Sequence, residues 1–165
     1  PVDPIAKVSK AEDEIVLKVA AIREKVINPV TGADHSNMIV RWRSPVERVF
    51  GSAVGSLGAE RVLRLLPLRG AQQNARGLAP LRAWMLPILR SSISSGRAKV
   101  SLEFFRTHLL AIAEECEEMA EEAKDSANSA KMLQTRAMQL WSLLGPYCAH
   151  ARDISSPSGF APLAP

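Results

Sequence analysis

Residues 97–148 read RAKVSLEFFRTHLLAIAEECEEMAEEAKDSANSAKMLQTRAMQLWSLLGPYC, and this stretch decides the fold. Its apolar residues recur at alternating steps of three and four, which is typical of amphipathic helices that bury one face. Asp125 or Ser126 can cap a new helix in the middle, and Gly145-Pro146 predicts its end. We therefore expect two long helices folded into a hairpin. Their apolar stripes are Leu102, Phe105, Leu109, Ile112, Cys116, Met119 and Ala123, then Ala130, Leu133, Ala137, Leu140 and Leu144.

Composition favours one helical domain. Of the 165 residues, 47% are hydrophobic, 23% are charged and only 5% are aromatic, so the length suffices for a core but strand-forming aromatics are scarce. The two cysteines, Cys116 and Cys148, fit neither a disulfide framework nor a zinc site, and we expect buried, reduced thiols. No apolar run is long enough to cross a bilayer, and no signal peptide is recognisable. We expect the chain to be part of a larger protein.

The same patterns predict further helices upstream. Ser9–Glu12 and Ser44–Glu47 match the capping-box pattern, which predicts the starts of the first two helices. Residues 28–43 are expected to form a loop, and Pro87 is expected to kink the fourth helix. The predicted helices are 10–27, 44–57, 59–66, 80–93, 97–125 and 126–145.

Taken as neighbouring pairs, these helices repeat at roughly 40–50 residues, the spacing of HEAT-like solenoids. The predicted fold class is all-α, with HEAT/armadillo-like helical hairpins stacked as a solenoid segment. We expect residues 1–43 to form an N-terminal helix and loop, residues 44–150 the repeats, and residues 151–165 an irregular tail.

Charge is distributed unevenly. Residues 1–100 carry 16 Lys/Arg against 8 Asp/Glu, whereas residues 101–165 carry 5 against 9. Between residues 41 and 99 only Glu47 and Glu60 oppose eleven cations, ten of which are arginine, the side chain that best forks onto phosphate. The sequence leaves two interpretations open, contact with nucleic-acid phosphates and internal pairing with acids. The candidate phosphate-binding residues are Arg41, Arg43, Arg48, Arg61, Arg64, Arg69, Arg76, Arg82, Arg90, Arg97 and Lys99.

An acidic run follows on the long helix. Several of its carboxylates lie four residues apart, which costs roughly 0.2–0.5 kcal/mol per pair in an isolated helix, and a basic partner would relieve that cost. A solvated face and a partner-binding face both remain open. The candidate partner-binding residues are Glu114, Glu117, Glu118 and Glu121.

The sequence offers no catalytic constellation. His35, His108 and His150 have no nucleophile at motif spacing, and there is no glycine-rich phosphate loop, so no cofactor, metal or small-molecule substrate is expected. Gly51, Gly55 and Gly58 instead indicate close helix packing. Among the tryptophans, Trp42 lies between two arginines and can stack on a base, whereas Trp84 and Trp141 are expected in the core, with exposed anchors as the alternative.

Several segments resemble the ribosomal RNA-processing protein twelve family. They are GAERVLRLLPL (58–68), NAR (74–76), WMLPILR (84–90) and the stretch from AK (130–131) to LWSLLGPYC (140–148). The resemblance covers roughly residues 44–150. It implies a large HEAT-repeat assembly factor of the nucleolus and nucleus that can shuttle to the cytoplasm.

The resemblance also implies a function. Such a protein is a non-enzymatic scaffold in small-subunit (pre-40S/90S) biogenesis that supports rRNA processing and nuclear export. The implied partners are pre-ribosomal RNA, assembly factors and ribosomal proteins of the small subunit, and the Ran/importin system. The alternative is a transport-receptor-like adaptor that binds proteins without touching RNA. A helical hydrolase is a third hypothesis, and the sequence lacks the nucleophile and base that it needs.

Overall fold

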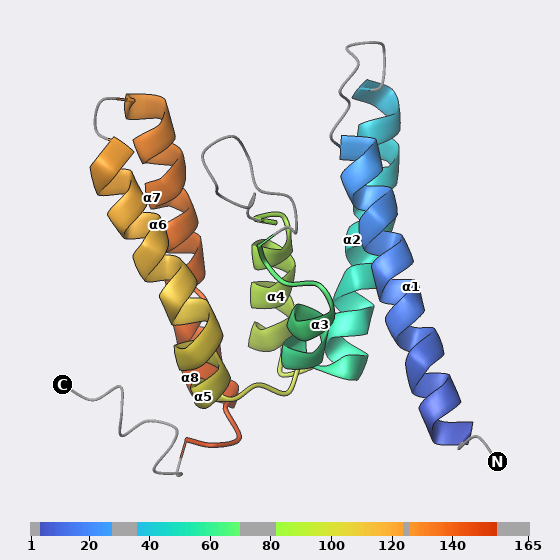
Figure 1. Cartoon of the computed structure of the whole chain (residues 1–165). Helices are drawn as coiled ribbons and strands as arrows, with labels where there is room; N and C mark the ends of the chain where they lie inside the picture. The colour runs from blue at the N-terminus through green and yellow to red at the C-terminus, as the bar shows by residue number, and fades with distance from the viewer. Residues whose placement is uncertain (1–3, 28–35, 70–81, 124–125, 155–165) are drawn as a thin grey trace.

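The computed structural model describes residues 4–27, 36–69, 82–123 and 126–154, with side chains described from residues 10 to 23 in the first of these ranges and from residue 45 onward in the others. Figure 1 shows the helices in a row, with a hairpin at each end and two shorter helices between them. The helices are α1 (Pro4–Ile27), α2 (Ser36–Leu57), α3 (Ala59–Leu65), α4 (Met85–Ser94), α5 (Leu102–Phe104), the π-helical turn η1 (Phe105–Leu110), α6 (Ala111–Glu122), α7 (Ala127–Trp141) and α8 (Leu144–His150).

The architecture is all-α, as the periodicity predicts. Over the described ranges no strand forms, and Val100 and Ala151 make only an isolated parallel bridge. Helices α6 and α7 form the expected hairpin, and α1 packs against α2. One predicted pairing is wrong: α3 does not form a hairpin with α4. Helix α4 packs against α2 and α8, and α3 packs against α2 and α1.

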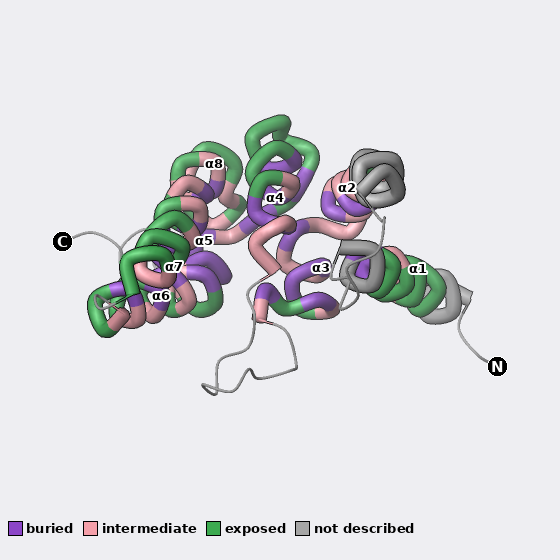
Figure 2. Tube along the Cα trace, turned by 90° about the horizontal axis from the view of Figure 1, so that it is seen from above, coloured by how far each residue is buried: buried purple, intermediate pink, exposed green. Residues whose placement is uncertain are grey.

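A continuous apolar core joins the elements. In Figure 2 the buried residues lie on the inward faces of the helices, and the exposed residues on the outer faces. Two aromatic pairs lie within it: Phe50 meets Trp84 edge to face with ring centroids 5.0 Å apart, and Phe105 meets Tyr147 at 5.3 Å. Phe50, Phe105 and Tyr147 are almost fully buried. The long helices therefore depend on tertiary packing, as amphipathic helices in globular proteins do.

Both predicted capping boxes are wrong. Helix α1 begins at Pro4, so Ser9 lies inside it, and α2 begins at Ser36, so Ser44-Pro45 lies inside α2. Residues 36–43 are helical rather than part of a loop, whereas residues 28–35 lie outside the described ranges. An amphipathic helix gains stability from packing along its whole length, and this can carry it past a local cap signal.

Two proline or glycine signals and one helix start also differ from the prediction. Pro87 is the third residue of α4, in the first turn, where its missing N–H removes no helical hydrogen bond, so no kink is required. Gly145-Pro146 does not end a helix: α7 ends at Trp141, and this dipeptide lies in the first turn of α8. The long helix begins at Leu102 rather than 97, because Ser101 accepts a hydrogen bond from the Phe104 N–H at 3.2 Å.

Candidate nucleic-acid interface

A basic hollow with a volume of about 550 Å³ opens where α2 meets α3. It is hereafter called the basic hollow. Five cationic side chains line it and one carboxylate opposes them. The lining residues are Gly55, Ser56, Leu57, Gly58, Glu60, Arg61, Arg64, Arg97, Lys99 and Arg152. Four of the eleven predicted phosphate-binding residues therefore converge here, although they come from α3 and from the connection between α4 and α5.

That connection lies close to two glycines, Gly55 and Gly58. A Cβ added at Gly55 would lie 3.6 Å from the Arg97 Cβ, and one at Gly58 would lie 3.5 Å from the Lys99 carbonyl oxygen. Gly58 also has φ +87° and ψ 150°, a conformation reached essentially only by glycine, and this sharp turn separates α2 from α3. Both added-Cβ distances are ordinary van der Waals contacts, so close packing does not require glycine at either position, and it is the backbone conformation that requires it at Gly58.

Three of the lining cations have no acidic partner among the residues that the structure describes. Arg64 is exposed, and its guanidinium carbon lies 5.7 Å over the ring of Phe104. Arg97 and Lys99 are exposed in the connection before α5. Arg61 differs from them, because its Nη2 donates a hydrogen bond to Asp13 on α1 at 2.6 Å. Positive charge left unpaired at a concave surface is the arrangement that attracts polyanions.

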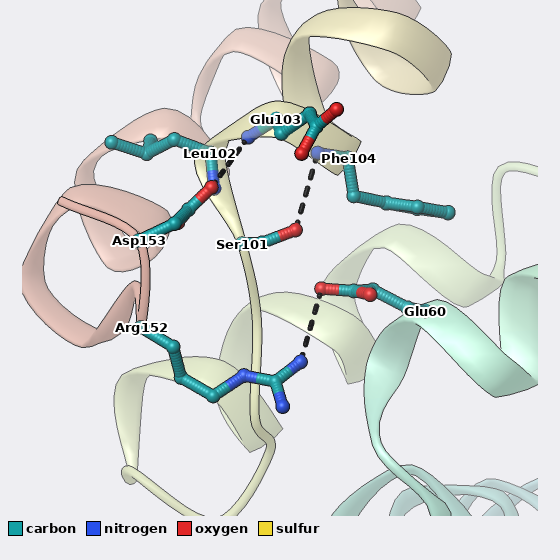
Figure 3. A network of polar contacts seen from close by, with 7 residues as sticks. All are labelled: Glu60, Ser101, Leu102, Glu103, Phe104, Arg152 and Asp153. Carbon is teal, nitrogen blue, oxygen red and sulfur yellow. Dashed lines mark hydrogen bonds and ion pairs between the residues drawn. The ribbon is translucent and has the colours of Figure 1, made fainter. Parts of the chain in front are cut away.

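The segment after α8 closes one side of the basic hollow (Figure 3). Arg152 lies 3.7 Å from Glu60, and Arg152 N–H donates to the Val100 carbonyl at 3.1 Å. Asp153 accepts hydrogen bonds from the N–H groups of Leu102 at 2.8 Å and Glu103 at 3.0 Å, so it caps α5 from 50 residues away. Desolvation raises the pKa of Asp153, but these backbone donors outweigh it and hold the pKa below its usual value.

The remaining predicted cations do not line the basic hollow. Arg69 pairs with Glu115 on α6, so internal pairing is correct at this position. Arg82 donates to the carbonyl oxygen of Pro67 at 2.6 Å. Arg48 and Arg90 are exposed on α2 and α4. The other three fall outside the side-chain description, and these are Arg41, Arg43 and Arg76.

The acidic run forms the exposed face of α6. Glu114, Glu118 and Glu121 are exposed, and Glu117 accepts a hydrogen bond from the Trp141 indole at 2.7 Å. Trp141 is 38% exposed, so the expectation that it lies in the core is wrong, and on the same helix Met138 is 72% exposed. Trp84 is half-buried against Phe50, in agreement with core packing.

The titratable groups do not assemble a reactive site in the described ranges. Burial raises the pKa of the Cys116 thiol and that of the Tyr147 phenol, with the charge of Glu60 adding to the second effect. Among all the residues that the structure describes, no three metal-ligating side chains cluster. No described helix is long and apolar enough to span a membrane. His108 stacks on Phe104 and His150 is exposed beside Gly96.

The chain is similar over most of its length to a known protein family. The model of the HEAT repeats of ribosomal RNA-processing protein 12 matches residues 11–162. The chain belongs to this family. The match includes α1 from residue 11 onward, which the sequence resemblance at residues 44–150 does not reach. The predicted HEAT class is thereby confirmed, together with the all-α architecture.

Individual members of the ribosomal RNA-processing protein 12 family agree with this assignment. The chain is 32% identical over 114 residues to the RRP12-like protein of Drosophila melanogaster and 32% identical over 112 residues to the putative ribosomal RNA-processing protein 12 of Schizosaccharomyces pombe. The human RRP12-like protein is 29% identical over 114 residues. Each match covers 67% of this chain but only 8–9% of the relative's length. No solved structure matches the chain.

Sequence reasoning missed Arg152 and Asp153, which were assigned to an irregular tail. No local spacing marks them, because their partners Glu60, Leu102 and Glu103 are 50 or more residues away. The one available signal is an Arg-Asp pair that directly follows a helix of this HEAT segment.

Proposed function

We propose that this segment is part of a non-enzymatic scaffold in small ribosomal subunit biogenesis and binds the phosphate backbone of pre-ribosomal RNA in the basic hollow. The observation that carries the proposal is the convergence of Arg64, Arg97 and Lys99 with no acidic partner in the described part of the chain. The names of the relatives, which refer to ribosomal RNA processing, support the choice of RNA as the polyanion.

The chemistry of the basic hollow suits a phosphodiester. Arg64 presents a planar set of donors held over Phe104, whereas Lys99 is a point charge on a flexible stem, so the pair offers both oriented and adaptable donors. The curvature of the surface concentrates the field of the cations. Binding of this kind releases condensed counterions, and its affinity falls steeply as salt is added.

The wider context follows from the family. The segment spans less than a tenth of the relatives' length, so most of the function of the whole protein lies elsewhere in it. We place the whole protein in the nucleolus and nucleus, where it supports rRNA processing and export of the subunit. Its partners there are assembly factors, ribosomal proteins of the small subunit and the Ran/importin system.

A salt titration tests the RNA contact. A fluorescein-labelled RNA stem-loop is titrated with the chain at several salt concentrations, alongside the variant Arg64→Ala/Arg97→Ala/Lys99→Ala. Each phosphate contact adds about 0.7–0.9 to the slope of log affinity against log salt, so loss of three contacts reduces that slope by about 2 to 3. Wild-type binding that does not depend on salt would contradict the proposal.

The matched control removes cations that lie elsewhere. Arg48→Ala/Arg90→Ala takes away two exposed arginines that do not line the basic hollow. It should leave most of the salt slope intact. If it weakens binding as much as the triple variant does, the contact is diffuse attraction to a basic protein, and the basic hollow is not the site.

A second candidate is a protein-binding adaptor. It is favoured by two exposed apolar side chains on α7, Met138 and Trp141. The Trp141 indole donates a hydrogen bond to Glu117, which places Trp141 beside the acidic face of α6. An apolar patch bordered by carboxylates suits a basic amphipathic helix of a partner. Glu114 and Glu118 are exposed on this face and have no basic partner in the part of the chain that the structure describes.

Charge reversal separates the two candidates. Glu117→Lys/Glu118→Lys/Glu121→Lys in the full-length family protein should reduce its co-purification with pre-ribosomal particles if the adaptor is correct, and should leave stem-loop RNA affinity of the segment unchanged. Unchanged co-purification would exclude this face as the contact surface.

A further inference from the structure

Two planar side chains, Phe104 and His108, extend outward from Arg64, one of the residues that line the basic hollow. The Arg64 guanidinium carbon is 5.7 Å from the Phe104 ring centroid, and the His108 ring stacks on Phe104 at 4.3 Å with only 9° between the planes. Phe104 is 4% exposed, whereas both Arg64 and His108 are exposed. A buried aromatic ring therefore connects a phosphate-binding candidate to an exposed imidazole. Figure 3 shows the Phe104 side chain directed away from Asp153, the residue that caps its helix.

The orientation of His108 is fixed at a second point. The Thr107 hydroxyl donates its hydrogen to the Glu103 carbonyl at 2.8 Å, and its oxygen lies 2.7 Å from His108 Nδ1. The Thr107 contact and the stacking on Phe104 together hold the imidazole flat on the phenyl ring before any ligand arrives.

The backbone around His108 is also unusual. His108 lies within η1, a π-helical turn inserted between α5 and α6. Such turns are rare, and they occur frequently at functional sites because they shift the register of the side chains around them. Here the turn coincides with the residue that extends the Arg64–Phe104 contact to the surface.

We propose that the exposed face of His108 stacks an unpaired RNA base whose backbone phosphate occupies the basic hollow. This inference rests on the proposed function and names its substrate class, single-stranded RNA. An aromatic platform next to uncompensated cations matches both halves of a nucleotide, because the base needs a flat apolar surface and the phosphate needs positive charge. In an RNA duplex the bases are stacked inside the helix, so only a loop, bulge or single strand can supply such a base.

Binding to two RNA forms tests the inference. The chain is titrated by fluorescence anisotropy with a labelled ten-nucleotide oligo(A) RNA and with a blunt RNA duplex that has no loop. Stacking contributes about 1–3 kcal/mol per base, so His108→Ala should weaken oligo(A) binding by at least about fivefold. It should leave duplex binding unchanged. The variant His108→Phe should retain the oligo(A) affinity, whereas His108→Leu, which has bulk but no ring, should not.

Controls distinguish stacking from damage to the fold. His150→Ala removes another exposed imidazole, one that lies beside Gly96 and stacks on no ring in the described structure, and it should have no effect on oligo(A) binding. Urea unfolding of His108→Ala must give the wild-type midpoint within error, or the comparison moves to His108→Leu against His108→Phe. Fluorescence of an oligo(A) carrying 2-aminopurine should be quenched by the wild type and not by His108→Ala.

The outcomes separate the two proposals. If wild type binds the duplex as tightly as oligo(A), or if His108→Ala, His108→Leu and His108→Phe all bind oligo(A) alike, the stacking inference is overturned. The proposed function still stands in that case if Arg64→Ala/Arg97→Ala/Lys99→Ala lowers the salt slope. If neither RNA shows salt-dependent binding, the proposed function and this inference fail together.

Discussion

The two flanks of α3 use arginine in opposite ways. On the flank toward α1, Arg61 donates to Asp13 at 2.6 Å and lies 4.0 Å from Glu12. On the flank toward α5, Arg64 lies over Phe104 with no carboxylate partner in the described structure. The two residues are three positions apart on one short helix, and they have the same chemistry. The first fastens two helices together, whereas the second leaves its donors available for a ligand.

This contrast shows why an arginine count is a poor guide to a binding surface. Eleven cations between residues 41 and 99 look alike in the sequence, but tertiary contacts divide them. Arg69 is paired with an acid of α6, whereas Arg64, Arg97 and Lys99 have no acidic partner among the described residues. Charge matters for function where the fold has left it uncompensated, and each prediction below tests one part of that division.

The largest effect on stability should come from truncating a buried side chain beneath both flanks of α3. Leu63 is 6% exposed and belongs to the core face of α3. Leu63→Ala should lower the free energy of unfolding by about 2–5 kcal/mol, because a cavity replaces buried methyl groups. Urea unfolding measures the change, and RNA affinity should fall with it as α3 loosens. Leu63→Met, which nearly conserves volume, should cost less than about 1.5 kcal/mol. Equal stability of Leu63→Ala and wild type would mean that α3 does not position the flanks.

The next effect contrasts two glycines that line the basic hollow. Gly58→Ala should lower the free energy of unfolding by about 1–3 kcal/mol, because φ +87° strains any residue with a Cβ. Gly55→Ala lies inside α2 with an ordinary 3.6 Å contact to the Arg97 Cβ, so it should be neutral or stabilise by up to about 1 kcal/mol. Thermal unfolding of both variants measures the difference. Two variants of equal stability would contradict the role assigned to Gly58.

The sequence predicts the fold better than it predicts element boundaries. The three-four periodicity correctly gives the α6–α7 hairpin, because an apolar stripe states directly which face must be buried. The capping boxes at Ser9 and Ser44 fail for the opposite reason. A cap stabilises a helix end by only about 1 kcal/mol, and the packing of further turns in α1 and α2 can outweigh that.

The sequence predicts some residues of the candidate site but not how the fold brings them together. The sequence lists Arg61, Arg64, Arg97 and Lys99 among eleven candidate cations, but it cannot show that these four converge and that Arg69 is paired elsewhere. The convergence depends on a long-range contact between the Gly55–Gly58 turn and the connection before α5. The sequence assigns His108 no role, and only its parallel stacking on Phe104, which in turn contacts Arg64, brings it near the basic hollow.

The third prediction concerns the cap that holds the α5 flank. Asp153→Ala should lower the free energy of unfolding by about 1 kcal/mol at pH 7, because the Leu102 and Glu103 N–H groups lose their acceptor. The pKa of Asp153 is depressed in the folded state, so its stabilisation is complete above the unfolded value of about 3.9 and disappears as pH falls through the lower folded value. Urea unfolding at pH 7 and at pH 3 or below should show the difference shrinking. A difference that grows on acidification would contradict the cap.

The smallest effect, and the sharpest comparison, pairs Arg61→Ala with Arg64→Ala. The Arg61 side chain is 37% exposed and that of Asp13 is 28% exposed, so solvent screens their ion pair and its loss should lower the free energy of unfolding by only about 0.2–1 kcal/mol. A double-mutant cycle with Asp13→Ala isolates the coupling between the two side chains. Arg64→Ala should change stability less than that and reduce the salt slope of RNA binding by about 0.7–0.9. Arg61→Ala should leave most of that slope in place, because its charge is already opposed by Asp13. The contrast is contradicted if Arg61→Ala and Arg64→Ala lower the free energy of unfolding equally and reduce the salt slope of RNA binding equally. In that case the two flanks of α3 are equivalent, and exposure rather than pairing decides which arginine meets a ligand.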